Sequence, residues 1–194
     1  MREIGKLVER GDALVVQGRY DDALTAYNEA IRLDSKLGLA WTGRGDAFYG
    51  QGKTNDALKA YDEAIRLEPK LAVAWNNKGC VLNALGKYND AIGAYDAAIQ
   101  LEPEGSDLGR VWHNKGLTFA NMGDYMEAQS CYEKAIRLNP KEADTWNDKG
   151  DVLSEQGKHE AAIKCWEKAM ELDPQLEDEC MDSIDVARRS MLRD

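Results

Sequence analysis

Apolar residues recur along the chain at intervals of three and four, the spacing that places them on one face of a helix. The clearest stretch contains Ala91, Ile92, Tyr95, Ala98 and Ile99. A second helical pattern precedes this one, and the pair returns with a period of 34 residues. Paired amphipathic helices at a fixed period predict an array of stacked helical hairpins.

Four tryptophans set the register of the repeat. Trp41, Trp75, Trp112 and Trp146 are separated by 34, 37 and 34 residues, so one three-residue insertion interrupts the period. The register predicts five repeats, at residues 4–37, 38–71, 72–105, 109–142 and 143–176. The insertion lies within residues 104–111, and we expect an offset between the hairpins on either side of it.

The tail at residues 177–194 carries one further amphipathic pattern, formed by Cys180, Ile184, Ala187 and Met191. Their spacing of four, three and four residues predicts a single helix with one apolar stripe. The end of a helical array exposes the face that the next repeat would cover, so we expect this helix to cap the array.

Small residues alternate with large ones in each repeat. Counting from the first residue of a repeat, position 8 is always glycine: Gly11, Gly45, Gly79, Gly116 and Gly150. Glycine inside a helix costs about 1 kcal/mol relative to alanine, so its recurrence requires a packing reason. We expect the two helices of each hairpin to approach closely there. Position 24 is always aromatic: Tyr27, Tyr61, Tyr95, Tyr132 and Trp166.

Turn residues mark the ends of the helices. A second glycine in every repeat falls where the first helix must end, and we expect a left-handed conformation at each of these glycines. They are Gly18, Gly52, Gly86, Gly123 and Gly157. Asp21, Asn55 and Asn89 are predicted to cap the second helices of the first three repeats.

The recurring Trp, Gly, Leu or Phe, Gly, Tyr, Ala, aromatic, Ala and Pro of these repeats resemble the tetratricopeptide repeat over nearly the whole chain. The resemblance implies an all-α fold, a right-handed α-solenoid of five helix-turn-helix hairpins with a C-terminal capping helix. It also implies a protein–protein interaction scaffold, which binds a peptide or protein surface in a concave groove lined by the first helix of each repeat.

Carrying over the groove positions of the family, residue by residue, gives a set of candidate binding residues. The set changes in character along the chain, from apolar through amide to acidic. Its members are Val8, Asp12, Leu39, Thr42, Asp46, Tyr49, Val73, Asn76, Asn77, Cys80, Asn83, Arg110, His113, Asn114, Leu117, Asn121, Asp144, Asn147, Asp148, Asp151 and Glu155.

Four asparagines in this set suit the recognition of an extended peptide: Asn76, Asn77, Asn114 and Asn147. One side-chain amide both donates and accepts a hydrogen bond, so it can pair with a peptide group whatever the side chain of that group. The alternative is that these amides are ordinary solvated helix residues.

The charge of the chain favours a neutral-to-basic partner. The net charge is −10 and the pI is near 4.8, which argues against nucleic acid because binding to phosphates requires clustered Lys and Arg. Residues 143–194 hold fourteen acidic and seven basic residues, so most of the excess lies there. Either a basic peptide or surface docks at this end, or the charge keeps an exposed end of the array in solution.

A structural or self-assembling role is the competing hypothesis. The first repeat has Leu7 in place of the tryptophan, and Val8, Val15 and Val16 form an apolar edge near it. Such an edge favours weak homo-oligomerisation through the ends or the groove of the array.

Enzymatic chemistry is not expected. His113 and Cys80 occupy groove positions of adjacent repeats, but no third residue is evident to orient them as a catalytic pair. No cofactor motif and no metal-ligand spacing is present. Cys80, Cys131, Cys165 and Cys180 lie far apart and suit free thiols in a reducing compartment. With no long apolar run, we expect no membrane segment and a cytoplasmic protein.

Overall fold

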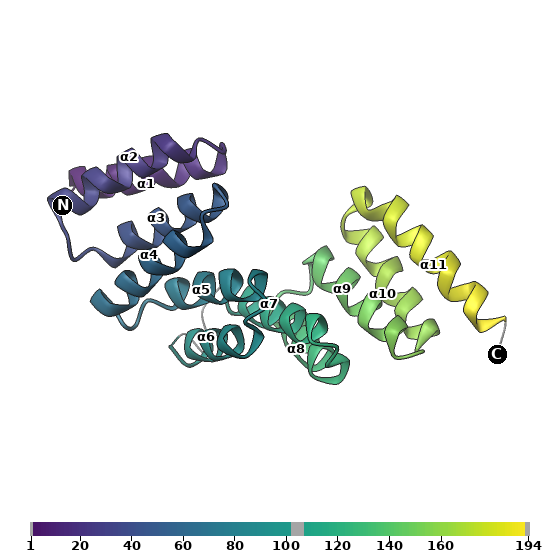
Figure 1. The fold of residues 1–194 in the computed structure, drawn as a ribbon. Coiled ribbons are helices and arrows are strands. Elements are labelled where there is room, and N and C mark those ends of the chain that lie inside the picture. Colours follow the sequence, from purple (N-terminus) through teal and green to yellow (C-terminus); the bar gives the residue numbers. More distant parts are fainter. Residues whose placement is uncertain (1, 102–106, 193–194) are drawn as a thin grey trace. The chain divides into compact units, whose positions relative to one another are not determined.

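The computed structural model describes residues 2–101 and 107–192 of the chain. In these ranges the chain forms eleven α-helices and one short 3-10 helix and contains no strand (Figure 1). The predicted all-helical architecture is therefore confirmed. Contacts divide the chain into two compact units, Met1–Pro103 and Glu104–Asp194.

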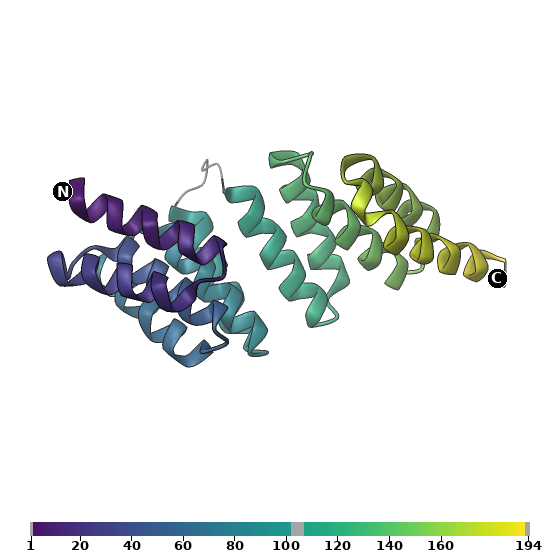
Figure 2. The ribbon, with the colours of Figure 1, turned by 90° about the horizontal axis from the view of Figure 1, so that it is seen from above.

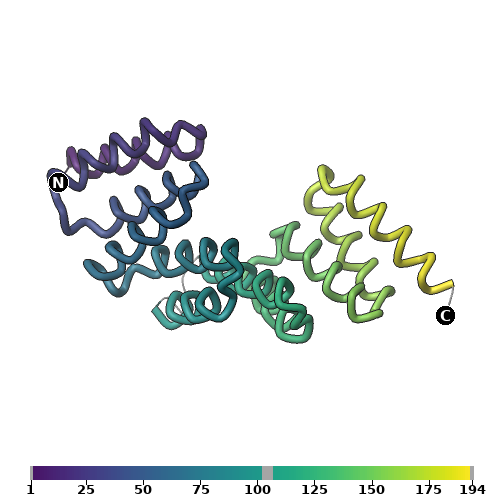
Figure 3. Tube along the Cα trace, viewed as in Figure 1, coloured from purple at the N-terminus to yellow at the C-terminus, as the bar shows by residue number. Residues whose placement is uncertain are grey.

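The first unit contains three helical hairpins. Its helices are α1 (Arg2–Val16), α2 (Tyr20–Leu33), α3 (Gly38–Gly50), α4 (Thr54–Leu67), α5 (Ala72–Ala84) and α6 (Tyr88–Leu101). Each odd-numbered helix packs antiparallel against the even-numbered helix that follows it, as the Cα trace shows (Figure 3).

The second unit contains two hairpins and a final helix. Its elements are α7 (Leu108–Asn121), α8 (Tyr125–Leu138), α9 (Ala143–Glu155), α10 (His159–Leu172), the 3-10 helix η1 (Pro174–Leu176) and α11 (Glu177–Met191). The expected offset concerns the hairpins on either side of residues 104–111, of which residues 104–106 lie outside the described part of the chain, so it stays a prediction.

The position-8 glycines allow the close approach that their recurrence predicted. A Cβ atom built on Gly79 would lie 2.6 Å from Cε1 of Tyr95, and one built on Gly45 would lie 2.5 Å from Cε1 of Tyr61. Real Cβ atoms do not approach a ring so closely. Each glycine thus leaves the space that the position-24 aromatic ring of the same hairpin fills.

The tryptophans connect successive hairpins. The indole Nε1 of Trp75 donates a hydrogen bond of 3.1 Å to the carbonyl oxygen of Pro69, in the turn that ends the preceding repeat. Trp146 makes the same bond to Pro140 at 3.0 Å. Trp75 and Trp146 therefore each pack as an apolar body and fix the preceding turn through the indole N–H.

The first helices of neighbouring hairpins pack against one another, and the second helices do not. In the first unit α1 contacts α3 and α3 contacts α5, and in the second unit α7 contacts α9. Among the described residues, α2 and α4 share no contact, and neither do α8 and α10. Within each unit this arrangement brings the odd-numbered helices together as one continuous surface, which we call the first-helix surface.

The predicted turn glycines at the helix ends are confirmed, and the predicted N-caps are not. All five turn glycines, including Gly52 and Gly86, have a positive φ, between 70° and 79°, as expected. The predicted caps are wrong for the second helices. These helices begin earlier, so that Asp21, Asn55 and Asn89 lie inside the first turn, and the N-cap residues of α2 and α4 are Arg19 and Lys53, which make no side-chain cap bond.

Helix α11 packs along α10, as two views at right angles show (Figure 1 and Figure 2). Cys180, Ile184 and Ala187 are buried in a cluster that includes Trp166. The apolar stripe is thus confirmed for three of its four members. The fourth member, Met191, is 40% exposed, so the prediction that it belongs to the buried stripe is wrong.

Candidate partner-binding surface

The first-helix surface exposes several large apolar side chains. On α3, Leu39 and Tyr49 are 48% and 40% exposed, and on α7 Leu117 is 37% exposed. Leu39, Thr42, Asp46 and Tyr49 are spaced by three and four residues and so share one face of α3. Thr42 on this face is buried, and its hydroxyl donates to the carbonyl of Gly38 at 3.0 Å.

Three predicted binding residues at position 9 also have a structural role. The hydroxyl groups of Tyr27 and Tyr61 donate hydrogen bonds of 2.7 Å to Asp12 and Asp46, each in the first helix of the same hairpin. In the last hairpin, Trp166 Nε1 donates to Asp151 at 3.0 Å. These carboxylates satisfy buried aromatic donors that would otherwise be unpaired.

The fourth hairpin lacks this bond. Position 9 is Leu117, so the hydroxyl of the fully buried Tyr132 has no hydrogen-bond partner among the described residues. Burial, together with the negative charge of Asp148 and Asp151, raises the pKa of Tyr132 far above its ordinary value, so the hydroxyl stays protonated. A buried donor without an acceptor lowers stability by about 1–3 kcal/mol.

We expect Tyr61→Phe to destabilise the protein by about 1.5 kcal/mol, because it removes a hydrogen bond to a carboxylate. Tyr132→Phe should leave stability unchanged or increase it, because it removes an unpaired hydroxyl. Urea unfolding of both variants, compared with the unmodified chain, measures the difference. Equal destabilisation by the two substitutions would contradict this account of the position-9 carboxylates.

The amide residues are largely bonded within the chain. Asn76 is buried, with 4% of its surface exposed, and donates to Asn77 Oδ1 at 3.0 Å. Asn77 in turn donates to Asp46 at 2.8 Å. Asn147 is 8% exposed and donates to Glu179 of α11 at 3.3 Å. A peptide backbone would have to compete with these bonds, and the predicted amide ladder stays a prediction.

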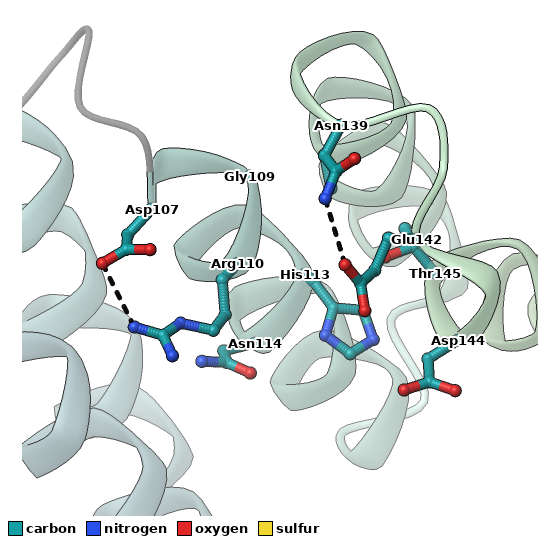
Figure 4. Close-up of a pocket in the computed structure, with 10 residues that line it drawn as sticks. Asp107, Gly109, Arg110, His113, Asn114, Asn139, Glu142, Asp144 and Thr145 are labelled. Carbon is teal, nitrogen blue, oxygen red and sulfur yellow. Dashed lines mark hydrogen bonds and ion pairs between the residues drawn. The ribbon is translucent and has the colours of Figure 1, made fainter. Parts of the chain in front are cut away.

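Asn114, the fourth amide, lies at a cavity of about 310 Å³ in the second unit (Figure 4). Three predicted binding residues beside it, Arg110, His113 and Asp144, also line this cavity. The remaining lining residues were not predicted: Asp107, Gly109, Ala135, Asn139, Glu142 and Thr145. They come from the start of α7, the end of α8, the turn before α9 and the first turn of α9, and none of them occupies a carried-over groove position.

Hydrogen bonds and ion pairs order the cavity walls. His113 Nε2 lies 2.7 Å from Asp148 Oδ2, and the imidazole ring lies 5.7 Å from the ring of Tyr132. Arg110 pairs with Asp107 at 3.3 Å, as Figure 4 shows. His113 is thus held between α8 and α9, and its partner Asp148 is itself one of the predicted binding residues.

Asp148, Asp151 and Glu155 of α9 and Glu179 of α11 form an acidic patch. Desolvation by the surrounding protein, with the neighbouring charges of Asp148, Glu179 and Glu155, raises the pKa of Asp151 to about 6. The hydrogen bond from Trp166 opposes this shift. A raised pKa means that the environment disfavours the ionised carboxylate, and a positively charged group placed nearby would stabilise this ionised form.

The other predicted binding residues differ in exposure. Asp12, Arg110, Asn121, Asp144 and Glu155 are exposed, whereas Val8, Val73, Cys80 and Asn83 are half-buried. Cys80 and His113 belong to different compact units.

The cysteines, the possible metal ligands and the apolarity of the helices also bear on the chemistry of the described residues. All four cysteines are free thiols, and burial raises the pKa of Cys165 and Cys180 above the ordinary value, which disfavours the reactive thiolate. Within residues 2–101 and 107–192 no group of side chains has the arrangement of a metal site. None of the described helices combines the length and apolarity that crossing a membrane requires.

Solved structures with the same fold resemble this chain closely in shape and weakly in sequence. PilF of Pseudomonas aeruginosa has a TM-score of 0.82 and 19% identity, over 99% of this chain and 91% of PilF. MamA of Desulfovibrio magneticus RS-1, from residue 41 to its end, has a TM-score of 0.73 and 21% identity, over 90% and 97% of the two chains.

A third structure, YrrB, is described as a tetratricopeptide repeat protein with an unusual peptide-binding site. It has a TM-score of 0.65 and 23% identity, over 87% of this chain and 85% of YrrB. At these identities the likeness shows the fold alone. A search of curated protein sequences found no match.

Family models cover most of the chain. One tetratricopeptide repeat model matches residues 8–72 and 42–106, and a second matches residues 109–142 and 143–176. The matches agree with the paired helices, the position-8 glycines and the linking tryptophans described above. The chain therefore belongs to the tetratricopeptide repeat family.

Proposed function

We propose that this protein is an interaction scaffold that binds a neutral-to-basic peptide or protein segment on its first-helix surface. The observation that carries the proposal is the exposure of Leu39 and Tyr49 on one face of α3. Many neighbouring polar groups on this surface are bonded within the chain, yet these two large apolar side chains remain in solvent. Exposed aromatic and aliphatic residues of this kind are the usual anchors of an interface.

Two further observations support the proposal. Family membership favours a non-enzymatic scaffold, and the structurally similar YrrB is described as having a peptide-binding site. The acidic residues of α9 and α11 would attract a basic segment rather than an acidic one, because desolvation and, to a smaller extent, the neighbouring negative charges already raise the pKa of Asp151.

The test is selection from a phage-displayed library of random twelve-residue peptides, followed by affinity measurement of the selected peptides. We expect Leu39→Ala combined with Tyr49→Ala to weaken binding at least tenfold, which corresponds to about 1.4 kcal/mol. Both residues are exposed, so the substitutions should change stability by no more than about 0.5 kcal/mol. They test the surface more cleanly than substitutions of Asn76 or Asn147, whose internal hydrogen bonds would also be lost.

Met126→Ala is the matched control, because Met126 is 67% exposed but lies on the second helix α8. It should leave affinity unchanged. The solution mass of the chain alone is measured at each concentration, so that self-association is recognised separately. Failure to select any peptide, or equal binding by the double variant, would contradict the proposed function.

A further inference from the structure

The cavity between α7 and α9 is partly open to solvent, and two carboxylates of its wall, Glu142 and Asp144, are exposed. Its volume of about 310 Å³ is at the lower end of the range for ligand sites and suits one side chain better than a cofactor. In Figure 4, His113, Glu142 and Asp144 surround the open space, and Asn114 and Arg110 lie beside it. Gly109 and Ala135 add a small apolar part to the lining.

The charge of the cavity is negative. Arg110 and Asp107 neutralise each other, and His113 is bound to Asp148. Glu142 accepts a hydrogen bond of 3.0 Å from the neutral amide of Asn139, which orients the carboxylate without compensating its charge. Among the described residues, neither Glu142 nor Asp144 has an ion-pair partner.

In the first unit a side chain occupies the corresponding space at the start of α3. There Glu68 covers the start of α3, and its Oε1 accepts a hydrogen bond of 2.6 Å from the backbone N–H of Gly38. The same interval of 30 residues in the second unit joins Asn139 to Gly109. The shorter Asn139 turns to Glu142 instead, so the corresponding space is left open at the start of α7.

We propose that this cavity binds the guanidinium group of an arginine in the partner segment, an inference that rests on the proposed function. A guanidinium group carries five N–H donors in a planar fork, so it can bind the carboxylates of Glu142 and Asp144 together. The apolar part of the lining accommodates the aliphatic stem of the arginine. The cavity would therefore select the side chain at one position of the partner segment.

The test adds N-acetyl-arginine amide, the probe, to the full chain. Binding is measured by NMR from the chemical shifts of the side-chain amide signals of Asn114 and Asn139. N-acetyl-citrulline amide, which has nearly the same shape and no charge, is the comparison ligand. We expect the arginine probe to shift both signals and to bind at least tenfold more tightly than the citrulline probe. Equal shifts with the two probes, or shifts confined to other residues, would overturn the proposal.

Two double variants separate the cavity from general charge. Glu142→Gln with Asp144→Asn should weaken binding of the arginine probe at least tenfold. Glu127→Gln with Asp185→Asn removes the same charge from exposed positions on α8 and α11 and should have little effect. If the two double variants weakened binding equally, the net charge of the chain rather than the cavity would be responsible, and the proposal would be wrong.

The outcomes for the cavity and for the proposed function are distinguishable. If library peptides bind through Leu39 and Tyr49 but the arginine probe does not bind, only the cavity proposal fails. If the probe binds at Asn114 and Asn139 but no library peptide is selected, the proposed function fails and the cavity remains an isolated cation site.

Discussion

Replacing Gly79 with alanine is expected to destabilise the protein by about 2–3 kcal/mol. The added Cβ atom would lie 2.6 Å from Cε1 of Tyr95 and 2.9 Å from its Cδ1 and Cζ atoms. Tyr95 is only 1% exposed, so the ring cannot move away without displacing its neighbours. Overpacking a close-packed interior in this way forces side chains out of their preferred rotamers or shifts the backbone.

Gly93→Ala in the same hairpin is the matched control. Gly93 lies within α6, and a Cβ atom built on it would meet no other atom within 4 Å. Alanine favours a helix over glycine by up to about 1 kcal/mol, so this variant should be more stable than the unmodified chain. Urea unfolding followed by circular dichroism gives both values. Destabilisation by Gly93→Ala, or no effect of Gly79→Ala, would refute the packing role of position 8.

The sequence alone predicted that position 8 must be small, and the structure identifies the reason as a ring. Recurrence in five repeats pointed to a close contact, because an unfavourable residue would not otherwise recur at one position. It did not identify the partner, since small residues of the second helix, such as Ala91 and Ala98, were equally compatible with the approach of two helices. The distance from Gly79 to the Tyr95 ring settles this point.

The candidate binding surface was less predictable than the fold. A carried-over groove position places a residue on the correct face of a helix, but it does not show what else that residue contacts. Asn76 is buried and bonded to Asn77, and Asp46 accepts bonds from both Tyr61 and Asn77. The two bonds to Asp46 join residues that are 15 and 31 positions apart, and such tertiary contacts do not follow from helical spacing.

The cavity at the start of α7 could not be predicted from the groove positions, because part of its wall comes from a turn. The only signal in the sequence was the change from Glu68 to Asn139 at the same position of two repeats. Whether this change opens a cavity depends on the direction in which the Asn139 side chain points, and the sequence does not give that direction. The N-caps failed for a related reason: the turn glycines are followed at once by the second helix, which leaves Asp21 and Asn55 within its first turn.

Replacing Ile184 with alanine is expected to cost about 2–5 kcal/mol, the usual range for removing a large aliphatic side chain from a core. Ile184 is 1% exposed and lies in the cluster formed by α9, α10 and α11, which includes Leu153 and Trp166. No hairpin follows α10 among the described residues, and α11 packs against Trp166 instead. Loosening α11 should therefore also expose the indole of Trp166 and shift the tryptophan fluorescence to longer wavelength.

Val186→Ala is the control for this prediction, because Val186 lies on the same helix but is 59% exposed. It should change the free energy of unfolding by no more than about 0.5 kcal/mol and leave the fluorescence unchanged. Urea unfolding and the emission spectrum of the folded state are measured for both variants. If Ile184→Ala lowered stability without any change in emission, the cluster would be weakened but α11 would still cover Trp166. If neither quantity changed, the capping role of α11 would be wrong, because the buried stripe would then contribute nothing to the end of the array.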